Sequence, residues 1–242
     1  MTHSTLRLLA SCVLAGALAP SIASANSWLL TYEAAGVGAT TATLSGGGVE
    51  NFDNRYPGTY LQLASAFGGS QIAGTYRNVV IGRGPNWGFD NSQHTFADYQ
   101  TGYSLALSQS VNYFGYWLGA ADSANVVTFF RGSQQVGSFE VGKLLTAAVQ
   151  GEAGYWGLSP SPGWPEAFAF VNFYSTGLGE TFDRIEFRQA IANGGWQESD
   201  NHTIGTYLTI GGVTLVPEAS SVALMIIGLA GIGAASRRRR LA

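Results

Sequence analysis

Residues 111–141 read VNYFGYWLGAADSANVVTFFRGSQQVGSFEV and are dense in aromatic and β-branched residues. Three apolar runs in this stretch, residues 112–119, 126–131 and 136–141, are separated by short segments that contain Gly, Asn or Asp. Aromatic and β-branched residues favour strands, whereas Gly, Asn and Asp favour the turns between strands. The stretch therefore predicts three successive strands, and it places Trp117 in the core.

The same pattern of short runs and turns extends to both sides of this stretch. The further strands expected are Trp28–Ala34, Tyr60–Ala64, Gly74–Ile81, Gly102–Ser108, Ala167–Tyr174, Asp183–Arg188 and Thr206–Val216. In Asp183–Arg188 charged and apolar residues alternate, which is typical of a half-buried antiparallel strand.

One helix is expected at Lys143–Gln150, with Leu144, Leu145 and Val149 facing inward. Two long loops, residues 82–101 and 150–166, interrupt the strands, and loops of this length often carry function. These elements predict an all-β fold: an antiparallel, two-sheet β-sandwich, jelly-roll-like, with one short helix.

Composition excludes several classes of protein. The 242 residues include 11% charged residues, against about 25% in an average soluble domain, and 33 glycines without a three-residue period. The chain is too apolar and aromatic for disorder, and its 12 Lys and Arg are too few for a nucleic-acid partner. Neither a collagen-like chain nor a long helical bundle fits.

The N-terminus has the three parts of a secretory signal peptide. Arg7 provides the positive charge, residues 8–19 form the apolar segment, and Ala23-Ser24-Ala25 predicts cleavage by signal peptidase before Asn26. The alternative is a lipoprotein cleavage box that ends at Cys12. Only four residues separate Cys12 from Arg7, which is too short for an apolar segment ahead of the cleavage site. Cleavage removes the single cysteine, so the mature domain would have no disulfide bond.

The C-terminus combines a Pro-Glu motif, an apolar segment and a basic cluster. Residues 219–235 carry no charge and are followed by Arg237, Arg238, Arg239 and Arg240. Seventeen helical residues cover about 26 Å, which predicts one marginal transmembrane helix. The four arginines would remain cytoplasmic and orient the preceding domain outward.

This tripartite tail resembles the PEP-CTERM sorting signal of Gram-negative surface proteins. The matching motif is Val216-Pro217-Glu218-Ala219-Ser220, with Ala219 where that family usually has a second proline. The resemblance implies cleavage near the motif by an exosortase, a membrane transpeptidase. Residues 111–141 also resemble the central hairpins of the β-sandwich ectodomains that commonly precede such tails.

The chain thus divides into a signal peptide (1–25), a β-sandwich ectodomain (26–216) and a sorting signal (217–242). The formal net charge is −3; losing Arg7 makes it −4, and losing Glu218 with the four tail arginines makes it −7. We expect an acidic ectodomain that crosses the inner membrane, is transiently anchored, and then occupies the cell surface or extracellular matrix.

No local sequence motif in the ectodomain indicates a catalytic site. His94 and His202 are its two histidines, and neither lies in a hydrolase, zinc-protease or phosphate-binding motif. We therefore expect both to be polar loop residues, and we name no catalytic residue. Paired carboxylates for glycoside cleavage remain an alternative, because they come from separate strands.

Two oxygen-rich segments suit a hard cation. Glu198, Asp200 and Asn201 form one, and Asp122, Ser123 and Asn125 form the other. Carboxylate and amide oxygens are ligands that Ca²⁺ prefers, so a structural calcium is one interpretation of Glu198, Asp200 and Asn201. The alternative is that such side chains cap turns by bonding to the backbone. No other cofactor is expected.

Four tryptophans fall in predicted loops beside Gly or Pro: Trp87, Trp156, Trp164 and Trp196. Exposed indole rings can stack on the C–H face of a sugar, which makes these four candidate carbohydrate-binding residues. The alternative is that they cover the ends of the core, since Trp is highly buried on average.

Taken together, these patterns favour a non-enzymatic surface or matrix protein of an exopolysaccharide-producing bacterium. Its partners would be the two processing enzymes, the membrane before processing, and an exopolysaccharide. The alternatives are a secreted glycan-acting hydrolase and a purely structural or adhesive coat protein.

Overall fold

The computed structural model describes residues 28–83, 92–100, 102–158, 165–192 and 195–215. The predicted signal peptide, the Pro-Glu motif, the apolar tail and the arginine cluster all lie outside these residues. Within the described ranges, no helix has the length and apolar character needed to cross a membrane.

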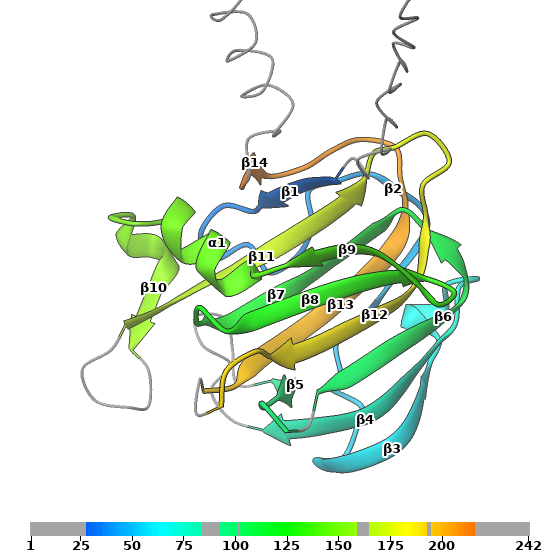
Figure 1. Cartoon of the computed structure of the whole chain (residues 1–242), viewed down its shortest axis with the longest axis horizontal. Helices are drawn as coiled ribbons and strands as arrows, with labels where there is room; N and C mark the ends of the chain where they lie inside the picture. The colour runs from blue at the N-terminus through cyan, green and yellow to red at the C-terminus, as the bar shows by residue number, and fades with distance from the viewer. Residues whose placement is uncertain (1–27, 84–91, 101, 159–164, 193–194, 216–242) are drawn as a thin grey trace, which may run out of the picture.

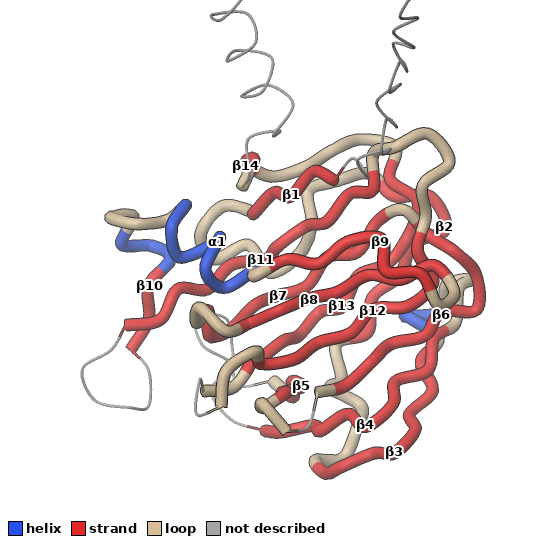
Figure 2. Tube along the Cα trace, viewed as in Figure 1, coloured by secondary structure: helices blue, strands red, loops and turns tan. Residues whose placement is uncertain are grey.

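The described residues form fourteen strands, one α-helix and two 3₁₀ turns (Figure 2). The strands are β1 (Trp28–Tyr32), β2 (Leu44–Glu50), β3 (Gly58–Ser65), β4 (Gly74–Arg83), β5 (Gln93–Ala97), β6 (Tyr103–Val111), β7 (Tyr113–Ala121), β8 (Asn125–Arg131), β9 (Gln134–Phe139), β10 (Trp156–Leu158), β11 (Pro165–Ser175), β12 (Phe182–Gln189), β13 (Gln197–Tyr207) and β14 (Val213–Thr214). The helix α1 is Val141–Ala148, and the 3₁₀ turns are Phe67–Gly69 and Ala153–Tyr155.

All strand pairs between described residues are antiparallel, and they connect in the order β14-β1-β11-β7-β13-β5-β4-β6-β12-β8-β9. The long strand β4 bends this path, because its first half pairs with β6 and its second half with β5. Asn78, at the change of partner, has φ 57°. The result is two layers joined at β4 (Figure 1).

Aromatic rings from the two layers meet in the core. Phe129 of β8 lies 5.1 Å from Phe173 of β11, and Phe187 of β12 lies 5.7 Å from Phe114 of β7. All four side chains are fully buried. Without disulfide bonds between described residues, this aromatic layer is the main source of stability, since each buried ring removes a large apolar area from water.

The fold confirms the all-β, sandwich-like prediction and much of its detail. The predicted helix is α1, shifted by two residues, with Leu145 and Val149 fully buried. Trp117 has no exposed surface. In β12, Ile185 and Phe187 are buried while the alternate charged residues face outward, as the sequence pattern predicted.

Four predictions about segments were wrong. The loop predicted at 82–101 contains β5, the loop at 150–166 contains β10, and residues 44–50 form the unpredicted β2. The strand predicted at Thr206–Val216 is instead the end of β13, a turn, and the two-residue β14. These segments are rich in Gly and polar residues, whose burial depends on distant partners rather than on local apolar pattern.

Candidate functional site

The structure describes two of the four candidate tryptophans, and it separates them. Trp156 packs partly buried against the core, and its Nε1 donates a 3.0 Å hydrogen bond to the Val149 carbonyl. Trp196 is 53% exposed. Trp87 and Trp164 lie outside the described residues. Trp156 therefore covers the core, as the alternative interpretation held, and Trp196 is the one that reaches solvent.

Trp196 lines a shallow hollow of about 490 Å³, which we call the aromatic ledge. Its lining residues are Asp98, Tyr99, Gln100, Ala192, Gly195 and Trp196. Tyr99 is 53% exposed, like Trp196. The ledge thus presents two large rings to solvent in one concave surface.

Strand pairing brings the two halves of the ledge together. Ala97, the last residue of β5, lies opposite Gln197, the first residue of β13. The residues just after β5 and just before β13 must therefore be neighbours, although about 95 positions separate them in sequence. This pairing places Asp98, Tyr99 and Gln100 beside Trp196.

The indole of Trp196 is held in place from below. It stacks on Phe96 of β5 with ring centroids 4.9 Å apart and an interplanar angle of 10°. The Phe96 ring in turn lies over Gly82 of β4, where a Cβ atom would come within 2.6 Å of Phe96 Cε1. A glycine at residue 82 therefore leaves room for Phe96, and Phe96 fixes one face of Trp196.

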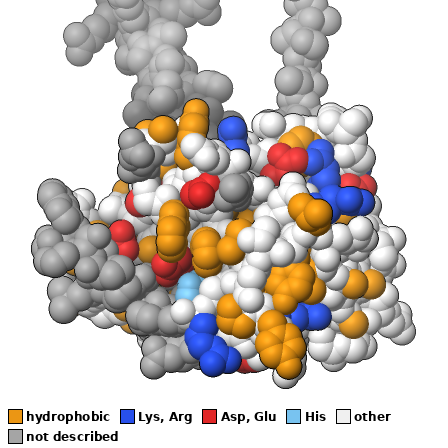
Figure 3. All heavy atoms as spheres, turned by 90° about the horizontal axis from the view of Figure 1, so that it is seen from below, with side chains coloured by type: hydrophobic (Ala, Val, Ile, Leu, Met, Phe, Trp, Pro, Cys, Tyr) orange, Lys and Arg blue, Asp and Glu red, His pale blue; other side chains and the backbone are white. Residues whose placement is uncertain are grey.

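Polar groups border the two rings. The Asp98 carboxylate accepts a 2.7 Å hydrogen bond from the Gln100 backbone N–H, which fixes the turn that carries Tyr99. The Asp98 carboxylate and the Gln100 side chain supply acceptors and donors at the rim. Seen from the β3–β5 end, the surface shows hydrophobic side chains beside acidic ones (Figure 3). Such a surface can stack on an apolar ring face and hydrogen-bond its hydroxyls.

Sequence reasoning found Trp196 but missed the rest of the ledge. Asp98, Tyr99 and Gln100 are not among the binding residues predicted from the sequence. The sequence feature that could have indicated a binding surface is Asp98-Tyr99-Gln100, which lies in a long predicted loop. It combines an aromatic ring with side-chain hydrogen-bond donors and acceptors. Its proximity to Trp196 follows from the β5–β13 pairing, which the local sequence does not reveal.

Both histidines lie in strands and are buried, so the expectation of two loop histidines was wrong. His94 belongs to β5 and His202 to β13. His202 stacks on Phe187 at 5.2 Å, and its nitrogens contact Tyr76 Oη at 3.0 Å and Ser199 Oγ at 3.1 Å. Burial lowers the pKa of His202 to about 3, so the ring is neutral at ordinary pH.

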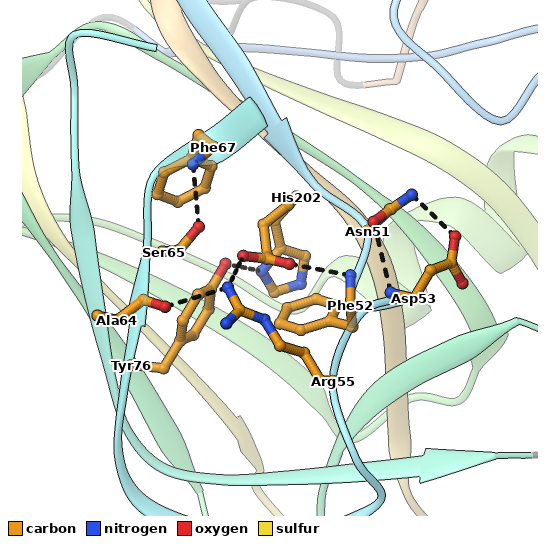
Figure 4. A network of polar contacts seen from close by, with 10 residues as sticks. Asn51, Phe52, Asp53, Arg55, Ala64, Ser65, Phe67, Tyr76 and His202 are labelled. Carbon is orange, nitrogen blue, oxygen red and sulfur yellow. Dashed lines mark hydrogen bonds and ion pairs between the residues drawn. The ribbon is translucent and has the colours of Figure 1, made fainter. Parts of the chain in front are cut away.

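Around His202 the polar contacts extend toward the surface (Figure 4). The Arg55 guanidinium forms a 2.6 Å ion pair with the nearly buried Glu50, and it also donates to the Ala64 carbonyl. The other Glu50 oxygen accepts a hydrogen bond from the Phe52 N–H. These contacts tie the end of β2 to the loop that follows it and to β3. His202 itself is fully buried, so its ring has no surface that a substrate could reach.

The two oxygen-rich segments are both engaged in protein contacts. Asp200 accepts hydrogen bonds from Ser92 Oγ at 2.8 Å and from the Asn201 N–H at 2.7 Å. Asp122 accepts from the Ala124 N–H at 2.8 Å and from Gln189, which is turn capping, and burial raises its pKa. Among the described residues no three His, Cys, Asp or Glu side chains are placed to hold a metal ion.

For Glu198, Asp200 and Asn201, calcium stays a prediction. Asn201 donates from its amide nitrogen to the Gly38 carbonyl, and its backbone has φ 51°. The donor set has the right chemistry for Ca²⁺, but the oxygens of Asp200 already serve Ser92 and the backbone.

Comparisons with known proteins add no further guide to function. No protein-family model matches this chain, and no curated protein or solved structure matches it. The class of protein is therefore defined by its fold and site alone: an antiparallel all-β domain that carries a solvent-facing aromatic hollow.

Proposed function

We propose that this chain is an exported, non-enzymatic surface or matrix protein that binds carbohydrate at the aromatic ledge. The observation that carries the proposal is the Trp196 ring, half exposed and held flat by Phe96, next to Tyr99, Asp98 and Gln100. A rigid, amphipathic platform of this kind suits a sugar ring, because stacking and hydroxyl recognition are needed together.

The lining of the ledge favours binding over hydrolysis. Glycoside cleavage needs two carboxyl groups about 5–10 Å apart across the bond. Of the described residues that line the ledge, Asp98 alone is acidic. A coat protein without a ligand would need no exposed aromatic ring fixed in one orientation, so the ledge also favours a binding role over a purely structural one.

Export and sorting belong to the same proposal, on a jelly-roll-like ectodomain. Signal peptidase would cut before Asn26, and an exosortase would process the tail at Val216–Ser220 after the membrane helix and Arg237–Arg240 have anchored it. The described ends support this topology, because β1 pairs with β14 and the Leu215 N–H donates to the Leu30 carbonyl at 2.8 Å. Both processed ends would thus leave from one edge of the domain.

The test is retention by polysaccharides in affinity gels, using the full chain in mild detergent. Trp196→Ala and Tyr99→Ala should each reduce retention about tenfold, in line with the loss of an aromatic contact in a binding site. Tyr56→Ala is the matched control, because Tyr56 is 85% exposed and does not line the ledge. Unchanged retention in both ledge variants, with the fold intact by circular dichroism, would overturn the proposal.

A further inference from the structure

A second polar surface lies on the outward side of β4, β6 and β12, which are neighbours in the sheet (Figure 1). Cross-strand pairing sets Arg77 opposite Ser104 and Ser104 opposite Glu186, and it sets Thr75 opposite Ala106 and Ala106 opposite Arg184. Directly paired residues share a face. We call this surface the β6 face: Thr75, Arg77, Ser104, Ala106, Arg184, Glu186 and Arg188.

The β6 face is hollowed because its central strand carries small side chains. Ser104 and Ala106 form the floor, while long side chains of β4 and β12 rise on both sides. Two shallow hollows of about 250 and 240 Å³ follow one another along it, one at Ser104 and Arg188 and one at Ala106 and Arg77. From Gly102 to Ser108 the strand covers about 20 Å, so the two hollows form an elongated track.

The track begins beside the aromatic ledge. Gly102 lines the first hollow, and Gln100, two positions earlier, lines the ledge. At Gly102 a Cβ atom would lie 2.8 Å from the Phe187 carbonyl oxygen and 3.2 Å from Arg188 Cβ, so a glycine here lets β12 pack closely against the start of β6. An extended ligand could therefore lie on the ledge and continue along β6.

The charged side chains of the β6 face indicate the charge of a ligand that would fit the track. Residues 26–216 contain 14 acidic and seven basic side chains, and three of those seven, Arg77, Arg184 and Arg188, are on the β6 face with Glu186. Arg184 pairs with Glu186 and lies over the Phe130 ring. Within the described chain, no carboxylate lies within ion-pair distance of Arg77 or Arg188.

Two surface guanidinium groups that form no ion pair with a described carboxylate give this face of an acidic domain a local positive surplus. Charges more than about 8 Å away are strongly screened at physiological salt, so this local surplus decides what the face attracts. A guanidinium group matches a carboxylate with two parallel hydrogen bonds. Arg77 and Arg188 are therefore suited to carboxylates that repeat along a chain.

We propose that the β6 face binds an acidic, uronate-containing polysaccharide, which lies on the aromatic ledge and extends along β6 with its carboxylates at Arg188 and Arg77. The inference rests on the carbohydrate-binding role proposed above, and it specifies the class of sugar. Ser104, opposite Arg77, and Thr75, opposite Ala106, supply hydroxyl groups to the floor and wall of the track.

The experiment measures retention of the full chain by polygalacturonate and by a neutral polysaccharide, at low and at high salt. Arg77→Gln with Arg188→Gln should lower retention by polygalacturonate about tenfold at low salt, and added salt should weaken the wild type toward the variant. Retention by the neutral polysaccharide should not change. Arg131→Gln is the matched control, because Arg131 is an exposed arginine at the end of β8 outside this face.

The outcomes separate this inference from the proposed function. Full polygalacturonate retention in the double variant overturns the inference, even if Trp196→Ala abolishes all retention. If the double variant alone loses retention and Trp196→Ala changes nothing, the ledge proposal fails and the acidic track stands. If the full chain forms dimers that the double variant loses, and no polygalacturonate is retained, the face is an interface between copies and the inference is wrong.

Discussion

His202 shows how a titratable side chain can serve the core instead of a reaction. Its ring lies among Phe52, Phe114 and Phe187, and both of its nitrogens have hydrogen-bond partners in the protein. The neutral ring fits this setting, whereas a charged one would be desolvated without a nearby carboxylate contact. Its lowered pKa of about 3 therefore means that protonation of His202 destabilises the folded state.

This residue predicts acid sensitivity of the fold. In the unfolded chain a histidine titrates near 6.5, so between about pH 6.5 and 3 the unfolded state binds a proton that the folded state excludes. The free energy of unfolding should fall as pH drops through this window, by up to about 1.4 kcal/mol per pH unit from His202. Urea unfolding at pH 7, 6 and 5 measures this slope.

Two controls isolate the contribution of His202. In His202→Gln, the free energy of unfolding should depend less steeply on pH between 6.5 and 5. The decrease in slope should equal the contribution of His202, up to about 1.4 kcal/mol per pH unit. The NMR signal of the folded wild-type His202 ring should not shift between pH 7 and 5. A ring that titrates near pH 6.5 in the folded protein would contradict the account.

At the scale of elements, the sequence predicted strands well where burial is apolar and failed where it is polar. β7, β8 and β9 lie within two residues of the predicted bounds. β13, by contrast, begins Gln197-Glu198-Ser199-Asp200-Asn201-His202 and has no apolar alternation. Within β13, the buried Ser199 and His202 hydrogen-bond to Thr95 and Tyr76, which are 104 and 126 positions away, so no local pattern could reveal the strand.

The same reasoning explains how much of the candidate site was predictable. Trp196 could be found, because a tryptophan beside Gly195 in a predicted loop is a recognisable feature. The supporting stack from Gly82 through Phe96 depends on β4, β5 and β13 lying side by side. Register between strands far apart in sequence is set by the whole sheet, and the sequence alone did not provide it.

Gly82→Ala tests that stack as a unit. The added Cβ would lie 2.6 Å from Phe96 Cε1, so the ring must move and Trp196 loses its support. We expect polysaccharide retention to fall several-fold and Tm to fall by a few degrees, as for mild overpacking. Gly157→Ala is the control, because its Cβ would lie 3.1 Å from the Phe168 ring, away from the ledge. Normal retention in Gly82→Ala would show that the stack does not position Trp196.

At the scale of the whole molecule, the β1–β14 edge, where the described ends of the chain lie, is far from the aromatic ledge. The described ends lie at β1 and β14, whereas the ledge follows β5, and five strand spacings of about 4.8 Å separate β14 from β5 in the sheet order. In Figure 1, β1 and β14 lie at the top of the domain and β5 lies toward the bottom. If the domain is anchored through its C-terminal tail, the ledge would lie about 24 Å farther from the membrane than the β1–β14 edge does.

Deletion of residues 217–242 tests the sorting part of the proposal. Without the predicted membrane helix and arginine cluster, the protein should be exported and then released, because the segment predicted to hold it in the membrane is gone. Cell fractionation with an antibody to the ectodomain measures the distribution. A truncated chain that still reaches and stays on the cell surface would contradict a sorting role for the tail.

The central claim is that a sugar ring stacks on Trp196, and saturation-transfer NMR tests it most directly. The measurement uses a polysaccharide fragment that the full chain retains, and it compares the wild type with Trp196→Ala and Tyr56→Ala. The account predicts strong saturation of the C–H protons on one face of the sugar with the wild type and Tyr56→Ala, and its loss with Trp196→Ala. An unchanged saturation pattern with Trp196→Ala would contradict it.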